Sequence, residues 1–175
     1  MLIPALDFPC SCDTVRYWIE CLRHGAAREL WSVLDSDLRM VIAQDFILAT
    51  VGVPDDSRAA ALAAREARGA VFNRMLAAVV RRWRQTHAEL ANGATIDKRA
   101  AGVGADLEVV VAYGRPAFGT RRTRQAGNPH VFITRFCHAQ GWSVAAAGPR
   151  LPAPGWPPTS WVIPQLRGED RRFSC

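Results

Sequence analysis

The chain divides into two halves with different hydrophobic periodicity, and their order restricts the possible folds more than any other feature. From Asp13 to about Leu90, apolar residues recur at the three- and four-residue spacing of amphipathic helices. From Asp106 to Ala147, apolar residues alternate with polar ones or form short runs between turn residues, as in strands. Helices followed by strands with short connections predict an α+β fold, with helices packed on an antiparallel sheet.

Glycine, proline and short acidic residues predict where the helices end. The first helix is expected to be capped by Asp13 or Thr14 and to stop at Gly25. A second helical region is interrupted near residues 35–37, where Asp35 or Ser36 can cap a new helix. Further breaks are expected at residues 52–56, at Gly69 and at the Asn-Gly turn of residues 92–93, in each case because these residues disfavour helix.

Three strands are expected, over residues 106–113, 130–138 and 142–146, after a short edge strand or ordered loop within residues 94–105. On the middle strand, alternation places His130 and Thr134 on one face and Arg135 on the other. Whichever face lines a cavity therefore contributes one of these two sets. His130 and His138 lie about 26 Å apart on an extended strand, so they are not expected to share a metal ion.

Changes in composition predict three segments. Residues 1–12 are interpreted as an N-terminal arm, residues 13–148 as one α+β domain, and residues 149–175 as an extended tail. The tail is rich in proline and contains Trp156 and Trp161. We expect it to pack on the domain, and the alternative is a ligand for a proline-recognition domain.

The charge suggests a nucleic-acid partner at first, with a net charge of +6 and a pI near 9.6. However, Lys98 is the only lysine, and the bias toward arginine and alanine is typical of the coding composition of a GC-rich bacterial genome. The arginines of residues 81–84 are expected to interact with a helix C-terminus, and those of residues 121–124 to lie in an exposed connection. Nucleic-acid binding is therefore the least favoured function.

Neither a secretory signal nor an apolar run long enough for a membrane helix is recognisable, which predicts a cytoplasmic protein without a membrane partner. The five cysteines are expected to be reduced thiols. The pair Cys10 and Cys12, with Cys21 and His24 nearby, has ligand types that suit zinc, but its C-x-C spacing differs from the usual structural site. No metal or other cofactor is expected.

Asp45 is the acid that most needs an explanation. It follows Val41 and Ile42 by one helical turn and so lies within their apolar stripe. One interpretation is a boundary residue that reaches solvent or pairs with an arginine. The other is a carboxylate that lines a cavity, where desolvation would raise its pKa and suit it to proton transfer.

The pattern over residues 13–148 resembles the NTF2-like superfamily (also called SnoaL-like or cystatin-like). The resemblance is carried by residues 30–39, by residues 43–47 and by the hairpin of residues 132–144 with its Gly141-Trp142 pair. It implies N-terminal helices packed on a curved antiparallel sheet that forms a cone around an apolar cavity. The chain departs from the family pattern at residues 51–56, where a break replaces the usual strand or hairpin.

The resemblance implies two classes of function. The favoured one is a non-catalytic module that binds a hydrophobic small molecule or another protein, and we expect it to be a homodimer. The alternative is an isomerase, dehydratase or cyclase that uses Asp45 as general base, with His130 or His138 and Tyr113 as hydrogen-bonding partners. In both cases the residues expected to line the cavity are Trp31, Phe46, Thr134, Arg135 and Trp142.

Overall fold

The computed structural model describes residues 8–97, 101–102, 106–115 and 128–148. Within these residues, all helices precede all strands, as the periodicity predicts. The helices are α1 (Ser11–His24), α2 (Ala27–Ser32), α3 (Ser36–Val51), α4 (Asp56–Ala63), α5 (Ala70–Thr86) and α6 (Ala88–Ala91). The strands are β1 (Ala94–Ile96), β2 (Ala101–Gly102), β3 (Leu107–Gly114), β4 (Pro129–Cys137) and β5 (Gly141–Gly148). The arginines of residues 121–124 and the tail after residue 148 lie outside the described residues.

The helix breaks expected near residues 35–37, at residues 52–56 and at Gly69 are confirmed, while the break at His87 was not predicted and the first cap differs. Helix α1 begins at Ser11, and its N-cap residue is Cys10, so the cap expected from Asp13 or Thr14 is wrong. Its stop at Gly25 is confirmed, and the φ of +71° there belongs to the left-handed region that favours glycine. Asp35 caps α3, because its side chain accepts a hydrogen bond from the N–H of Asp37 at 3.0 Å.

The strands form one antiparallel sheet in the order β1-β3-β4-β5. Strand β2 pairs with β3 on the same edge as β1, because β4 occupies the other edge of β3. At the outer edge of β5, the N–H of Asp35 donates to Val144 at 2.8 Å, and the N–H of Val144 donates to Val33 at 2.9 Å. The segment before α3 therefore covers part of an edge that would otherwise be open to another chain.

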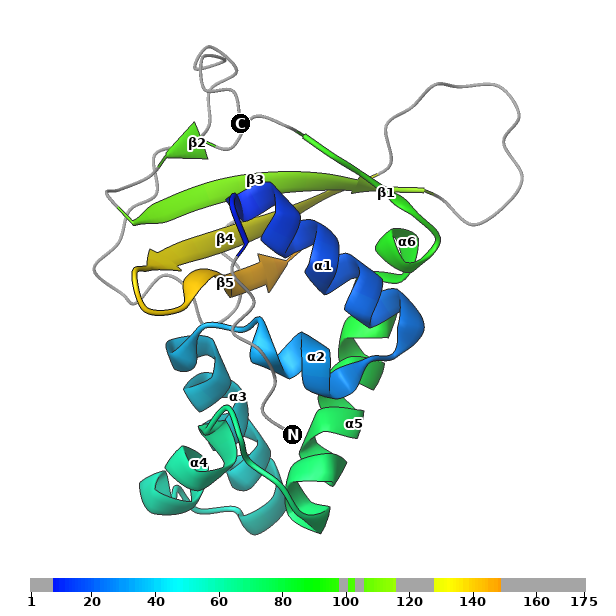
Figure 1. Cartoon of the computed structure of the whole chain (residues 1–175). Helices are drawn as coiled ribbons and strands as arrows, with labels where there is room; N and C mark the ends of the chain where they lie inside the picture. Colours follow the sequence, from blue (N-terminus) through cyan, green and yellow to red (C-terminus); the bar gives the residue numbers. More distant parts are fainter. Residues whose placement is uncertain (1–7, 98–100, 103–105, 116–127, 149–175) are drawn as a thin grey trace.

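Helix α1 lies across one face of the sheet (Figure 1), and Trp18 is the centre of its buried side. The Trp18 ring is fully buried and meets Phe132 of β4 edge-on, with ring centroids 5.1 Å apart. Such a contact adds aromatic attraction to the burial of apolar area. Helix α6 approaches β3 so closely that a Cβ on Gly114 would lie 2.5 Å from the Cβ of Glu89, so only glycine fits there.

Helices α3, α4 and α5 form a second group beyond the β5 end of the sheet (Figure 1). Helix α4 packs on α3, and α2 lies between α1 and α5. The α+β class is confirmed, while the described strands form an open sheet and not a closed one. No helix in the described ranges is both long and apolar enough to cross a membrane.

Candidate functional site

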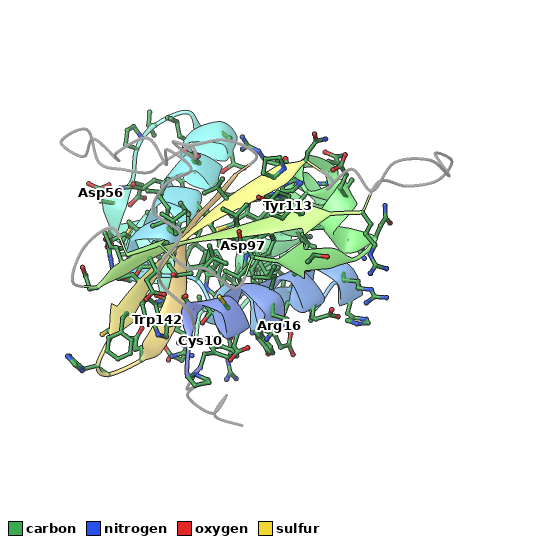
Figure 2. All side chains as sticks on the ribbon, turned by 90° about the horizontal axis from the view of Figure 1, so that it is seen from above. Cys10, Arg16, Asp56, Asp97, Tyr113 and Trp142 are labelled. Carbon is green, nitrogen blue, oxygen red and sulfur yellow. The ribbon has the colours of Figure 1, made fainter. Side chains whose placement is uncertain are left out.

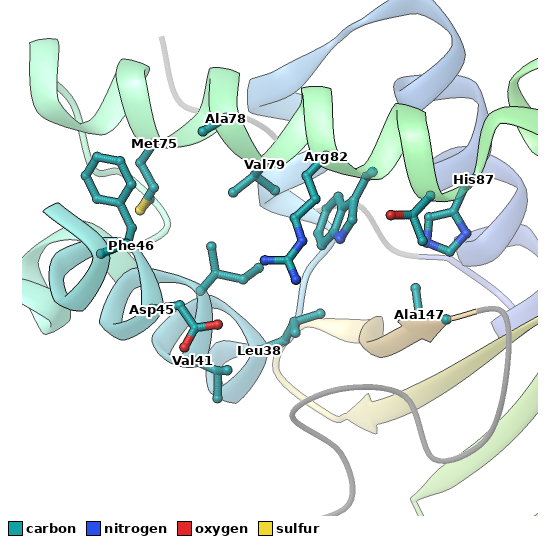
Figure 3. A pocket seen from close by; sticks show the side chains of 15 residues that line it. Leu38, Val41, Asp45, Phe46, Met75, Ala78, Val79, Arg82, His87 and Ala147 are labelled. Atoms are coloured by element: carbon teal, nitrogen blue, oxygen red, sulfur yellow. The ribbon is translucent and has the colours of Figure 1, made fainter.

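A groove between α3 and α5 encloses about 350 Å³. Phe46 and Met75 stand at one end of the groove, and His87 stands at the other (Figure 3). Helix α3 contributes one wall, α5 and the residue after it contribute the other, and the last residues of β5 close one end. The lining residues are Leu38, Val41, Ile42, Asp45, Phe46, Ala49, Met75, Ala78, Val79, Arg82, Trp83, Thr86, His87, Ala147 and Gly148.

The groove exists because two apolar helix faces oppose each other without closing. On each helix the lining positions recur every three or four residues, which is the spacing of one helix face. Val41, Ile42 and Val79 remain only partly buried, so neither stripe is fully covered by the other. Ala78 leaves room in the middle of the α5 wall because its side chain is a single methyl group.

Two opposite charges stand midway along the groove. Asp45 on α3 and Arg82 on α5 point toward each other from opposite walls (Figure 3), and both are exposed. They do not form one of the ion pairs found among the described residues. Asp45 therefore reaches water at the mouth of the groove, and the desolvation that would suit it to act as a base is absent.

A buried pair of histidines forms the inner end. His87 follows α5 directly, and its backbone N–H donates to Trp83 at 2.7 Å, which fixes the residue at the helix end. Its Nδ1 lies 2.9 Å from the Nδ1 of His130 on β4, and both residues are buried. The Trp18 ring meets His87 edge-on, with centroids 5.4 Å apart. The pair thus joins the helical half to the sheet inside the core.

Burial determines the charge state of this pair. Burial, and to a smaller extent the neighbouring His130, lower the pKa of His87 to about 4. Burial also lowers the pKa of His130, with Glu89 acting in the opposite direction. Both rings are therefore neutral at pH 7. One Nδ1 then carries the hydrogen that it donates to the other.

Of the residues predicted to be catalytic, the structure places Asp45 in the groove and His130 directly behind its inner end. Tyr113 and His138 do not line it. Tyr113 is near the far end of β3, where it pairs with Pro129, and His138 is exposed beyond β4 against the Phe136 ring. The four predicted residues therefore do not form one site.

Of the five side chains predicted to line the cavity, Phe46 lines the groove and the other four do not. Trp31 is buried and donates from Nε1 to the carbonyl of Ala64, the residue after α4, at 3.3 Å. Thr134 is buried and donates to the Glu108 carbonyl at 3.2 Å. Core side chains of α1 pack in the space between the helices and the face of the sheet, where the cavity was expected, and the groove lies between α3 and α5.

Arg135 and Trp142 belong to the opposite end of the sheet from Tyr113 (Figure 2). The guanidinium of Arg135 binds Asp35 at 3.0 Å and Asp37 at 2.7 Å, which ties β4 to the start of α3. The Trp142 ring packs on Phe136, with centroids 5.3 Å apart. Both side chains serve the packing of the fold.

His87 was not predicted from the sequence as a site residue. The position of Arg82 opposite Asp45 across the groove was not predicted either. His87 follows Trp83 by four residues, so it continues the α5 stripe by one more turn. That spacing is the signal that could have found it.

Among the arginines of residues 81–84, Arg84 donates to the carbonyls of Leu22 and Arg23, at 3.1 and 2.7 Å. It therefore caps the C-terminus of α1, while it also lies in the last turn of its own helix α5, as expected.

Metal-binding geometry is absent from the described part of the chain, where no three His, Cys, Asp or Glu side chains gather around a common point. The Cys10 thiol donates to Asp13 at 3.4 Å, and the Cys12 thiol contacts the Asp97 carbonyl at 3.9 Å. Burial raises the pKa of Cys21 to about 11, so its thiol stays protonated.

Comparison with known proteins adds no relative, since no family model, no curated protein and no solved structure matches the chain. The geometry of the groove and of the histidine pair is therefore the basis for a functional hypothesis.

Proposed function

We propose that this protein binds an apolar small molecule in the groove between α3 and α5. The observation that supports this most is the pair of opposed apolar helix faces left half-covered around a space of about 350 Å³. Sites for small molecules are concave, mostly apolar, and have volumes of roughly 300–1,000 Å³. The few polar groups of the groove, at Asp45, Arg82 and His87, are the kind that orients such a molecule.

Binding without catalysis is favoured over an enzyme of the isomerase, dehydratase or cyclase type. The enzymatic hypothesis needs a buried carboxylate, and Asp45 is exposed. Its expected partners Tyr113 and His138 lie outside the groove. Kinship with the NTF2-like superfamily stays a proposal, supported by the α+β order and by the antiparallel sheet.

The test is a binding titration with N-phenylnaphthylamine, a neutral apolar dye whose fluorescence rises in an apolar environment. The variant Ala78→Trp places an indole in the middle of the groove, and Ala77→Trp places the same side chain on the exposed side of α5. Ala78→Trp should weaken dye binding by about tenfold or more. Ala77→Trp should leave the affinity within about twofold of wild type.

Two results would contradict the proposal. One is wild-type protein that produces no rise in dye fluorescence. The other is an equal loss of affinity in both tryptophan variants, which would place the bound dye elsewhere. Circular dichroism of each variant confirms that the comparison is made between folded proteins.

A further inference from the structure

The histidine pair leaves one nitrogen of each ring without a protein partner. The two Nδ1 atoms, 2.9 Å apart, satisfy each other. The Nε2 atoms of His87 and His130 are both buried, and neither has a hydrogen-bond partner among the described residues. A buried polar atom that lacks a partner is costly, so such an atom at a cavity calls for a ligand group.

Only one of the two rings belongs to the groove. His87 is among the lining residues and His130 is not, so His130 stands behind His87 as seen from the cavity. The His87 ring lies at the inner end, beside Ala147 of β5 (Figure 3). The remainder of that end is formed mainly by apolar atoms of residues such as Trp83. A ligand that fills the groove lengthwise therefore ends at this imidazole.

The shared proton restricts what His87 can offer. Whichever Nδ1 holds the hydrogen, one Nε2 of the pair carries an N–H and the other carries a lone pair. The Nε2 of His87, the ring of the pair that lines the groove, is therefore a donor in one arrangement and an acceptor in the other. A hydroxyl group matches both arrangements because it donates and accepts, whereas a carboxylate matches only the donor and an ammonium only the acceptor.

Charge also favours an uncharged group at this end. Both imidazoles are neutral at pH 7, and they are enclosed by Trp18 and Phe132. A charged group placed here would lose its water inside an aromatic core, which is strongly unfavourable. The charged side chains of the groove, Asp45 and Arg82, stand midway along it.

We infer that the His87–His130 pair is the polar end of the groove and selects an apolar molecule with a terminal, uncharged hydroxyl group. This inference rests on the proposed function, because it names the class of ligand for the same groove. His87 makes the contact with the hydroxyl. His130 is a positioning residue that holds the His87 ring and shares its proton.

The test compares two neutral probes that differ by one hydroxyl, β-naphthol and naphthalene, as competitors of N-phenylnaphthylamine. Naphthol is the less apolar molecule, so an apolar groove without a polar end would favour naphthalene. The wild-type protein should instead prefer naphthol by about fivefold, the size expected of one net hydrogen bond. In His87→Phe, naphthalene should still compete with the dye, and naphthol should bind no more tightly than naphthalene.

His138→Phe is the matched control, because it makes the same change at an exposed histidine outside the groove and should keep the wild-type preference. Imidazole nitrogen NMR of the wild-type protein gives a readout that requires no variant. Naphthol should shift the Nε2 resonance of His87 more than naphthalene does.

The possible failures are distinct. If neither probe displaces the dye, both the inference and the proposed function are overturned. If both probes compete with equal affinity, or naphthalene competes better, only the inference is overturned. A preference for naphthol that survives His87→Phe would also overturn it.

Discussion

At the scale of single residues, the His87–His130 contact is the most unusual feature of the molecule. Two imidazoles share one hydrogen bond at 2.9 Å inside an aromatic core, and burial lowers the pKa of each. The unfolded chain has no such burial, so its histidines titrate near the ordinary value of 6.5. The difference between the folded and unfolded pKa values makes the stability of the fold depend on pH.

The sign of that dependence follows from the direction of the shift. The folded pKa of His87 is about 4, below the ordinary value, so below about pH 6.5 the unfolded chain binds the proton that the folded chain excludes. Between about pH 7 and about pH 5, His87 should therefore remove about 2 kcal/mol from the free energy of unfolding. Urea unfolding of wild type and His87→Phe at both pH values measures this, and the variant should lose less stability on acidification.

His138→Phe is the control for this measurement, because it replaces an exposed histidine. It should show the wild-type loss of stability between the two pH values. An identical loss in wild type and in His87→Phe would mean that His87 is not held neutral by burial in the folded protein.

At the scale of elements, the start of α3 joins the two halves of the chain. Asp35 caps α3, accepts hydrogen bonds from Arg135 and Ser143, and pairs through its backbone with Val144 of β5. Its side chain is nearly buried, whereas that of Asp37, which binds the same Arg135 nitrogen, is 68% exposed. The position of the α3 wall of the groove relative to the sheet therefore depends on Asp35.

These two aspartates provide a matched pair of substitutions. Asp35→Ala removes a helix cap and one member of a largely buried ion pair, so it should lower the free energy of unfolding by about 3 kcal/mol. Asp37→Ala removes an exposed partner of the same arginine and should cost about 1 kcal/mol or less. Urea unfolding of both variants tests this, and equal losses would show that Asp35 does not hold α3 to the sheet.

The boundaries of these elements were predictable because local chemistry determines them. Gly25, Asp35 and Gly69 mark helix ends through backbone freedom or capping, and neither effect requires knowledge of distant residues. The N-terminal cap of α1 was not predictable from local chemistry in the same way. Helix α1 starts at Ser11, whose hydroxyl donates to Glu108 of β3, and local sequence does not reveal such a distant contact.

At the scale of the whole molecule, the groove depends on which helix faces which, and periodicity carries no information about that choice. A position in a cavity was one of two interpretations of Asp45 and an expectation from the resemblance for Phe46, and both residues line the groove. The facing wall comes from α5, however, and not from the sheet, because α1 already covers the sheet's helical face. The contact of His87 with His130 joins residues from different halves, so spacing within either half could not reveal it.

The central claim is that an apolar molecule lies between α3 and α5, and intermolecular NOEs between naphthalene and the protein test it most directly. The account predicts NOEs from the same ligand to Val41 or Ile42 on α3 and to Met75 or Val79 on α5. NOEs confined to the exposed side chains at the end of α3, such as Leu48 and Val53, would contradict it, because they would place the molecule on the surface outside the groove.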